Sequence, residues 1–243
     1  MKTEFEQCIE EGYKKYLSIH TRSPEKIVPI HGCIARMIAD KLDSRYKIVS
    51  KGYEGNKEYR ISGLYYNKDM DIVVLCDNKP VGAIGFKFIT SNYSQNSNNI
   101  FELMVGETVN IKTVGVKVMQ VIILKRKTPY YSSRHKRFIK MESISDNNLS
   151  KYMKLVEAQS EFSPDLLLFG FIDSGDEARI ESAIYNNEII NRSEFNSSEL
   201  LPLVDVNLVK YESSNKDLED FINQHGNIDN FIQKFVNMIL LNS

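Results

Sequence analysis

The stretch YYNKDMDIVVLCDNKPVGAIGFKF, residues 65–88, decides the fold of this chain. It contains two apolar, β-rich segments, Asp71–Leu75 and Val81–Phe88, separated by the turn signal Asp77-Asn78-Lys79-Pro80. The stretch therefore predicts a β-hairpin. Asp71 and Lys87 stand among residues that such a hairpin buries. A buried charge is costly unless it is paired or binds a cation, so these two residues are candidates for a functional site.

Patterns on both sides of the hairpin complete the fold. Before it, apolar residues at helical spacing predict two helices, around residues 5–17 and 34–42, and β-rich segments predict strands at 46–50 and 59–66. After it, residues 89–99 predict a polar loop, residues 100–111 a helix with Asn98 or Asn99 as N-cap, and Val116–Leu124 a buried strand. This order predicts an α/β fold with a central mixed β-sheet flanked by helices.

The second half of the chain is less regular. It predicts a helix over Leu149–Val156, a strand over Asp165–Ile172 and a long amphipathic helix over Leu218–Leu241, with Gly226 as a break point. No stretch rich in Pro, Gly or Ser separates two domains. We therefore expect residues 1–243 to form a single domain, with a core at about 25–125 and additions at 126–243.

The composition is that of an ordinary globular protein, with 42% apolar and 26% charged residues. The three cysteines are widely spaced and odd in number, which favours reduced thiols and a cytoplasmic location over a disulfide framework or a zinc site. No apolar run approaches the roughly 18 residues that a membrane span needs, so we expect no membrane role.

Positive charge is concentrated in one segment. Residues 125–140 contain seven Lys or Arg and no acid, whereas the remainder of the chain has 24 basic and 32 acidic residues, a balance of −8. A local basic patch on an acidic body favours oriented docking of a polyanion over nonspecific coating by it.

The layout of the hairpin resembles the PD-(D/E)XK nuclease superfamily, in which an Asp begins one strand and a Lys lies on the next. Residues 56–112 are also similar to a group of type II restriction endonucleases. The similarity rests on the tyrosine pair before Asp71, the KF at 87–88, the SNYSQNSNN of residues 91–99 and the GETVN of residues 106–110. The resemblance implies a Mg²⁺-dependent enzyme that cuts double-stranded DNA at a specific sequence.

The resemblance also implies roles for individual residues. In that superfamily, acidic residues hold Mg²⁺ at the scissile phosphate and the lysine positions or activates the attacking water, which implies a metal ligand at Asp71 and a catalytic lysine at Lys87. The chain departs from the motif at Met70, where a Pro is usual, and at Gly85, where a second acid is expected. Some members supply that acid from the following helix instead.

Two helical residues, Glu102 and Glu107, are candidates for the missing acid. At helical spacing Glu107 shares a face with Leu103, Met104 and other apolar residues that should pack on the sheet, and Gly106 beside it should permit close approach to the strands. We therefore prefer Glu107 as the second metal ligand, while Glu102 stays open as an alternative.

Two polar segments are candidates for DNA contact, because Asn, Gln and Arg read base edges and cations follow phosphates. They are Ser91, Asn92, Tyr93, Gln95 and Asn96 in the first, and Lys125, Arg126, Lys127, Arg134, Lys136 and Arg137 in the second.

The implied partners follow from the symmetry of such DNA sites. A palindromic site favours a homodimer, with the C-terminal helix as a candidate interface, and a restriction system would include a DNA methyltransferase that need not touch this chain. The alternative function is a catalytically inactive DNA-binding protein on a nuclease fold, with Gly85 marking the lost site.

Overall fold

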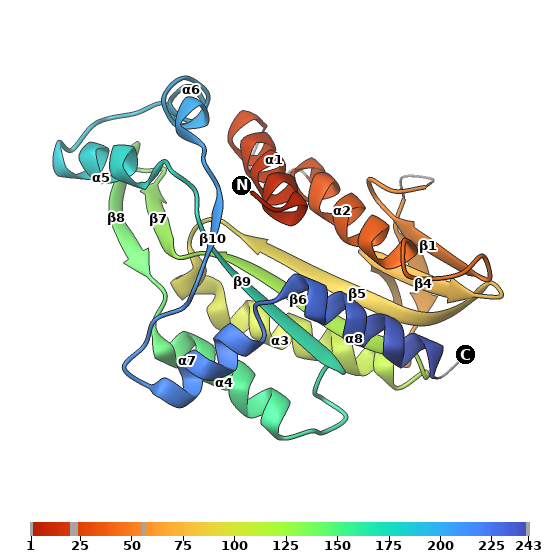
Figure 1. Cartoon of the computed structure of the whole chain (residues 1–243). Helices are drawn as coiled ribbons and strands as arrows, with labels where there is room; N and C mark the ends of the chain where they lie inside the picture. The colour runs from red at the N-terminus through yellow and green to blue at the C-terminus, as the bar shows by residue number, and fades with distance from the viewer. Residues whose placement is uncertain (1, 20–23, 55–56, 242–243) are drawn as a thin grey trace.

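A six-stranded mixed sheet forms the centre of the protein (Figure 1). The computed structural model describes residues 2–19, 24–54 and 57–241. The strand order is β1-β4-β5-β6-β9-β10, in which β5, β6 and β9 run parallel and the outer pairings are antiparallel. The strands are β1 (Tyr46–Ser50), β4 (Ile72–Cys76), β5 (Lys79–Ile89), β6 (Lys117–Lys125), β9 (Leu166–Asp173) and β10 (Asn207–Val209). The predicted α/β fold with a central mixed sheet is confirmed.

Helices cover both faces of this sheet (Figure 1). One face packs against α1 (Glu4–Ser18), α2 (Val28–Ala39) and α8 (Ile228–Leu240). The other packs against α3 (Tyr93–Lys112), α4 (Asp146–Glu157) and α7 (Lys216–Gln224). The order α1, α2, strands, α3, β6 is the predicted one, and β9 and β10 from the second half of the chain extend the same sheet.

Two smaller sheets lie outside the central one. They are the hairpin of β2 (Tyr59–Ser62) with β3 (Asn67–Met70) and the hairpin of β7 (Lys127–Ser132) with β8 (Arg137–Ser143). The β7–β8 hairpin stands at one end of the molecule with α5 (Glu177–Tyr185) and α6 (Arg192–Phe195) (Figure 1). Short turns complete the described chain: η1 (Pro24–Ile27), the π-helical η2 (Asn196–Leu200) and η3 (Leu201–Leu203).

The predicted central hairpin is β4–β5. Its turn is the two-residue loop Asp77-Asn78, whose φ angles of 49° and 67° are those of the type I′ turn that joins tightly twisted strands. Lys79 and Pro80 already belong to β5. All five residues of β4 are buried, as expected of an inner strand with helices on both faces.

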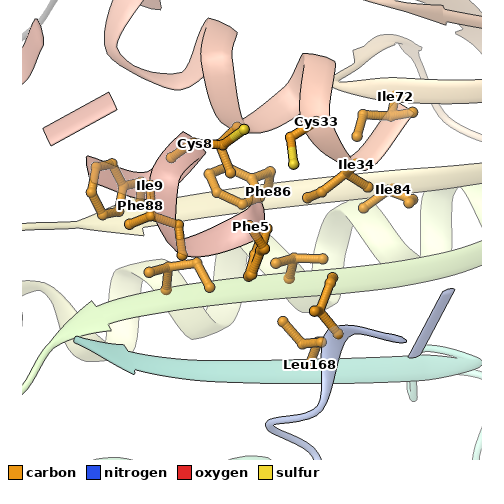
Figure 2. Close-up of a cluster of buried hydrophobic side chains, with 14 of the residues drawn as sticks. Phe5, Cys8, Ile9, Cys33, Ile34, Ile72, Ile84, Phe86, Phe88 and Leu168 are labelled. Carbon is orange, nitrogen blue, oxygen red and sulfur yellow. The ribbon is translucent and has the colours of Figure 1, made fainter. Parts of the chain in front are cut away.

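The pleat of β5 divides its side chains between the two faces. Ile84, Phe86 and Phe88 point into the cluster formed with α1 and α2, as Figure 2 shows. Because successive side chains of a strand alternate, Gly85 and Lys87 face α3. Ala83, two residues before Gly85, lies in the cluster that contains Ile111 of α3.

The prediction of a polar loop over residues 89–99 holds only for residues 90–92, because Ile89 ends β5 and α3 already begins at Tyr93, with Asn92 rather than Asn98 or Asn99 as its N-cap. Asn and Ser have weak helix propensity, but tertiary contacts with α4 override it here. The buried Tyr93 hydroxyl donates to the carbonyl oxygen of Asn148 at 3.3 Å, and Asn148 Nδ2 donates to Ser97 Oγ at 3.2 Å.

The predicted C-terminal helix is divided at Gly226 into α7 and α8. The apolar face of α8, including Phe231, Phe235 and Ile239, is buried in the cluster beneath α1 and α2. The C-terminal helix therefore uses its apolar face inside the fold, and a dimer interface on this helix would have to use its exposed residues.

Lys125, at the end of β6, lies in the interior. Its side chain has 0% exposure, and its Nζ is 2.5 Å from Asp176 Oδ1 and 3.1 Å from the hydroxyl of Tyr13. Tyr13 and Asp176 are themselves joined by a hydrogen bond of 2.7 Å. This buried ion pair connects α1 and the start of α5 to the end of the inner strand β6.

We predict that Lys125→Met lowers the free energy of unfolding by about 3 kcal/mol, because it leaves the Asp176 carboxylate buried without its cation. Denaturant titration measures the change. Lys127→Met is the matched control, since Lys127 pairs with Glu181 at 2.9 Å where both side chains are more than 40% exposed, and it should cost less than about 1 kcal/mol. Equal losses in the two variants would contradict the structural role of Lys125.

Candidate functional site

The candidate site is a row of residues across the sheet, on the face that α3 covers. Ile72 pairs with Ile84, and Gly85 pairs with Gln120, so Asp71, Gly85 and Gln120 are neighbours at the start of β4, on β5 and on β6. Directly opposed residues of paired strands share a face and lie close together. Asp71 and Gln120 therefore flank Gly85.

Glu107 of α3 fills the space above Gly85. A Cβ atom at position 85 would collide with Glu107 Oε1 and would lie 2.6 Å from Gln120 Oε1 and 2.8 Å from Gln120 Nε2. Glu107 is 5% exposed, and it lies among the buried residues of α3. The helical carboxylate thus occupies the place where a side chain of β5 would otherwise stand.

Two lysines compensate the charge of Glu107. Lys68 Nζ lies 3.1 Å from Glu107 Oε2, and Lys87 Nζ lies 3.9 Å from Glu107 Oε1. Burial opposes the protonation of Lys68, but the charges of Glu107 and Asp71 outweigh it and raise its pKa. The predicted residues Lys87 and Glu107 are therefore brought together, and Lys68 joins them from β3.

The Asp71 carboxyl is held in place by the backbone of β5. Its Oδ2 accepts a hydrogen bond from the N–H of Phe86 at 2.7 Å, which uses one of its two oxygens. Burial raises the pKa of Asp71 to about 6; the Lys87 ammonium and the Phe86 N–H act against this rise, and the charge of Glu107 adds to it. Asp71 therefore gives up its proton at a pH of about 6, where a cation would compete with that proton for the carboxylate.

The two helical candidates lie in different places on α3, and the reasons for this differ in part from those expected. Glu102 is exposed on α3, away from the row, whereas Glu107 faces it. Leu103, expected to pack on the sheet, is 68% exposed, so that prediction is wrong. Nothing lies within 4 Å of a Cβ built on Gly106, so the close approach is made at Gly85 and not at Gly106.

Sequence reasoning missed Lys68 and Gln120. Gln120 had a visible signal, because it is the one uncharged polar residue in the apolar run VKVMQVIIL that forms β6. Lys68 had none, since its role depends on how the β2–β3 hairpin sits against α3.

Glu107 Oε1 and Gln120 Oε1 both lie over Gly85, and oxygen atoms are the ligands that Mg²⁺ uses in proteins. Within the described residues, no three His, Cys, Asp or Glu side chains are grouped so as to hold a metal ion. A cation at this row would therefore have two carboxylates, Asp71 and Glu107, which is within the number that Mg²⁺ uses while it keeps water ligands. The buried Gln120 Oε1, beside Glu107, has no hydrogen-bond partner among the described atoms, which also fits a cation.

Of the first group of candidates for DNA contact, Tyr93 is excluded from the surface. Its side chain is fully buried between α3 and α4. Ser91 and Asn92 are half-buried, and Gln95 and Asn96 are exposed in the first turns of α3. Gln95 Nε2 donates to Glu142 Oε1 of β8 at 2.7 Å, which links this end of α3 to the β7–β8 hairpin.

The basic segment divides into paired and unpaired cations. Lys125 is buried, which contradicts its assignment to DNA contact, while Arg126 and Lys127 pair with Asp173 and Glu181. Within the part of the chain that the structure describes, Arg134, Lys136 and Arg137 make no ion pair. These three residues lie at the β7–β8 turn and the start of β8, so the unneutralised charge is concentrated at the tip of that hairpin.

Comparisons of the chain with protein-family models, with curated proteins and with solved structures gave no match. Among the described residues, no helix has both the length and the apolar character that crossing a membrane requires.

The pKa of Asp71 predicts a pH-dependent stability of the metal-free protein. Its folded pKa of about 6 lies above the ordinary value of 3.8, so its ionisation destabilises the fold as pH rises between these values. We predict that Asp71→Asn is more stable than the unsubstituted protein at pH 8 by about 1 to 3 kcal/mol, and by much less at pH 4. Denaturant titration in a chelator checks this.

Asp69→Asn is the control for that measurement. Asp69 is paired with Arg60 at 2.7 Å on the surface, and this partner lowers its pKa. Its replacement should give no gain in stability at pH 8. A gain for Asp71→Asn that is the same at both pH values would contradict the proposed titration.

Proposed function

We propose that the protein is a type II restriction endonuclease of the PD-(D/E)XK superfamily, which hydrolyses phosphodiester bonds of double-stranded DNA at a specific sequence with Mg²⁺. The observation that supports this most is the position of Glu107. The motif lacks its strand acid at Gly85, and the carboxylate of Glu107 stands in the space above that glycine, between the strands of Asp71 and Gln120.

In this proposal Asp71 and Glu107 hold the metal ion. When bound, Mg²⁺ would neutralise charge on the scissile phosphate and favour deprotonation of a water molecule. The side chain of Lys87, 26% exposed at the edge of the row, is an ammonium and would orient the attacking water, which forms a new P–O bond as the scissile P–O bond breaks. Lys68 neutralises the outer oxygen of Glu107.

The DNA would lie along the end of the molecule that carries the start of α3 and the β7–β8 hairpin. Gln95 and Asn96 are exposed at the start of that helix, and the unpaired cations Arg134, Lys136 and Arg137 stand at the hairpin tip. A homodimer would match a palindromic site, and a methyltransferase of the same system would protect host DNA without direct contact with this chain.

One observation favours the alternative, a catalytically inactive DNA-binding protein on the same fold. Lys68 and Lys87 already compensate the charge of Glu107, so the buried carboxylate does not depend on a cation for neutralisation. Cleavage and binding assays separate the two functions.

We predict that Lys87→Ala and Glu107→Gln each reduce cleavage of phage DNA in Mg²⁺ by a factor of at least about 100, because general acid–base contributions and charge stabilisation at such sites are of this size. Gel analysis of the fragments measures the rate. Binding of DNA in Ca²⁺ or a chelator should persist in both variants.

Glu102→Gln is the matched control, since Glu102 is on the same helix but exposed. It should cut at the rate of the unsubstituted protein. Discrete fragments that survive Lys87→Ala would contradict the proposed mechanism, and a complete lack of cutting by the unsubstituted protein on methyltransferase-free DNA, with binding intact, would favour the alternative.

For DNA binding, we predict that replacing Arg134, Lys136 and Arg137 together by Ala weakens the affinity at least tenfold and makes binding less dependent on salt, because about three phosphate contacts are lost. Fluorescence anisotropy at several salt concentrations measures both. The control is replacement of Arg126 and Lys127, whose charges are already paired. Equal effects in the two sets would contradict the assignment of the hairpin tip.

A further inference from the structure

Gln120 carries a buried oxygen atom that the fold does not satisfy. The residue is 0% exposed in the centre of β6. Its Nε2 donates to Glu107 Oε1 at 3.2 Å and to Thr108 Oγ1 at 3.3 Å, whereas its Oε1 has no partner among the described residues. A buried acceptor without a partner destabilises the fold, and the great majority of buried polar groups in folded proteins have one.

The position of this oxygen points to a ligand. Asp71, Gly85 and Gln120 form one row across β4, β5 and β6, with neighbouring strands about 4.8 Å apart. A Cβ built on Gly85 would lie 2.6 Å from Gln120 Oε1 and would also collide with Glu107 Oε1. Both oxygens thus converge on the space above the glycine, with the Asp71 carboxyl on the adjacent strand.

We propose that Gln120 Oε1 is a third protein ligand of the divalent cation, beside Asp71 and Glu107. The inference rests on the proposed function and deepens it. Hard cations bind the carbonyl oxygen of Gln as well as carboxylate oxygens. A neutral amide adds an oxygen ligand without further negative charge. The bond from Nε2 to the Glu107 carboxylate, which can only accept, fixes which end of the amide carries the free oxygen.

A competing explanation is that Gln120 acts only through Nε2, as a positioning residue that holds Glu107. The two explanations differ in the effect of Gln120→Glu. This variant keeps an oxygen at the position but removes both N–H donors and places a second carboxylate beside Glu107. A ligand role predicts that it retains or strengthens cation binding, and a positioning role predicts that it weakens binding.

The test is Mn²⁺ binding to the full-length protein without DNA, measured by electron paramagnetic resonance and calorimetry. For a ligand role, Gln120→Met, which has a similar volume and no oxygen, should weaken Mn²⁺ binding at least about tenfold. Gln120→Asn, a milder change that withdraws the oxygen by one methylene, should also weaken it and serves if the Met variant does not fold. Gln120→Glu should bind Mn²⁺ at least as tightly as the unsubstituted protein.

Two controls make the outcomes distinct. Gln233→Met replaces an exposed glutamine of α8 and should leave Mn²⁺ binding unchanged. Glu107→Gln should weaken it. If the unsubstituted protein binds no Mn²⁺, the proposed function fails. If the unsubstituted protein binds Mn²⁺ and Glu107→Gln weakens that binding, but Gln120→Met and Gln120→Asn do not, only the proposed role of Gln120 is overturned. If Gln120→Met, Gln120→Asn and Gln120→Glu all weaken Mn²⁺ binding, Gln120 is a positioning residue and not a ligand.

Discussion

The carboxylate of Glu107 can enter the sheet interface only because Gly85 has no side chain. Any Cβ at position 85 would overlap Glu107 Oε1 and crowd the amide of Gln120. This close approach places the Glu107 carboxylate over β5, with its Oε1 3.9 Å from Lys87 Nζ. Gly85 is therefore the residue that lets a carboxylate of α3 reach the surface of the sheet.

The ionised side chains around this row have a net charge of zero in the metal-free protein. Asp71 and Glu107 contribute two negative charges when ionised, and Lys68 and Lys87 contribute two positive charges. Such a cluster can fold without metal, because the two ammonium groups lie beside the buried Glu107 carboxylate and compensate its charge. A bound dication would make the cluster positive, which favours an approaching phosphate.

The basic segment shows that a run of like charges in a sequence has no single role. Lys125 is used in the interior to tie α1 and α5 to β6, and its neighbours Arg126 and Lys127 are paired on the surface. The cations without an ion pair among the described residues, Arg134, Lys136 and Arg137, lie at the tip of the β7–β8 hairpin. The surface that can meet a polyanion is therefore smaller than the sequence predicted, and it lies further from the sheet.

Local patterns in the chain were enough to predict the hairpin, the α/β order of elements and Asp71, Lys87 and Glu107 as buried or partly buried charges, because strand alternation and helical periodicity are local properties. Only the tertiary structure decided that residues 93–99 are helical, that Leu103 and Gly106 face solvent, and that Lys68 and Gln120 join the site. These outcomes depend on which face α3 turns to the sheet and on contacts between segments far apart in the chain, and neither is encoded in the spacing of neighbouring residues.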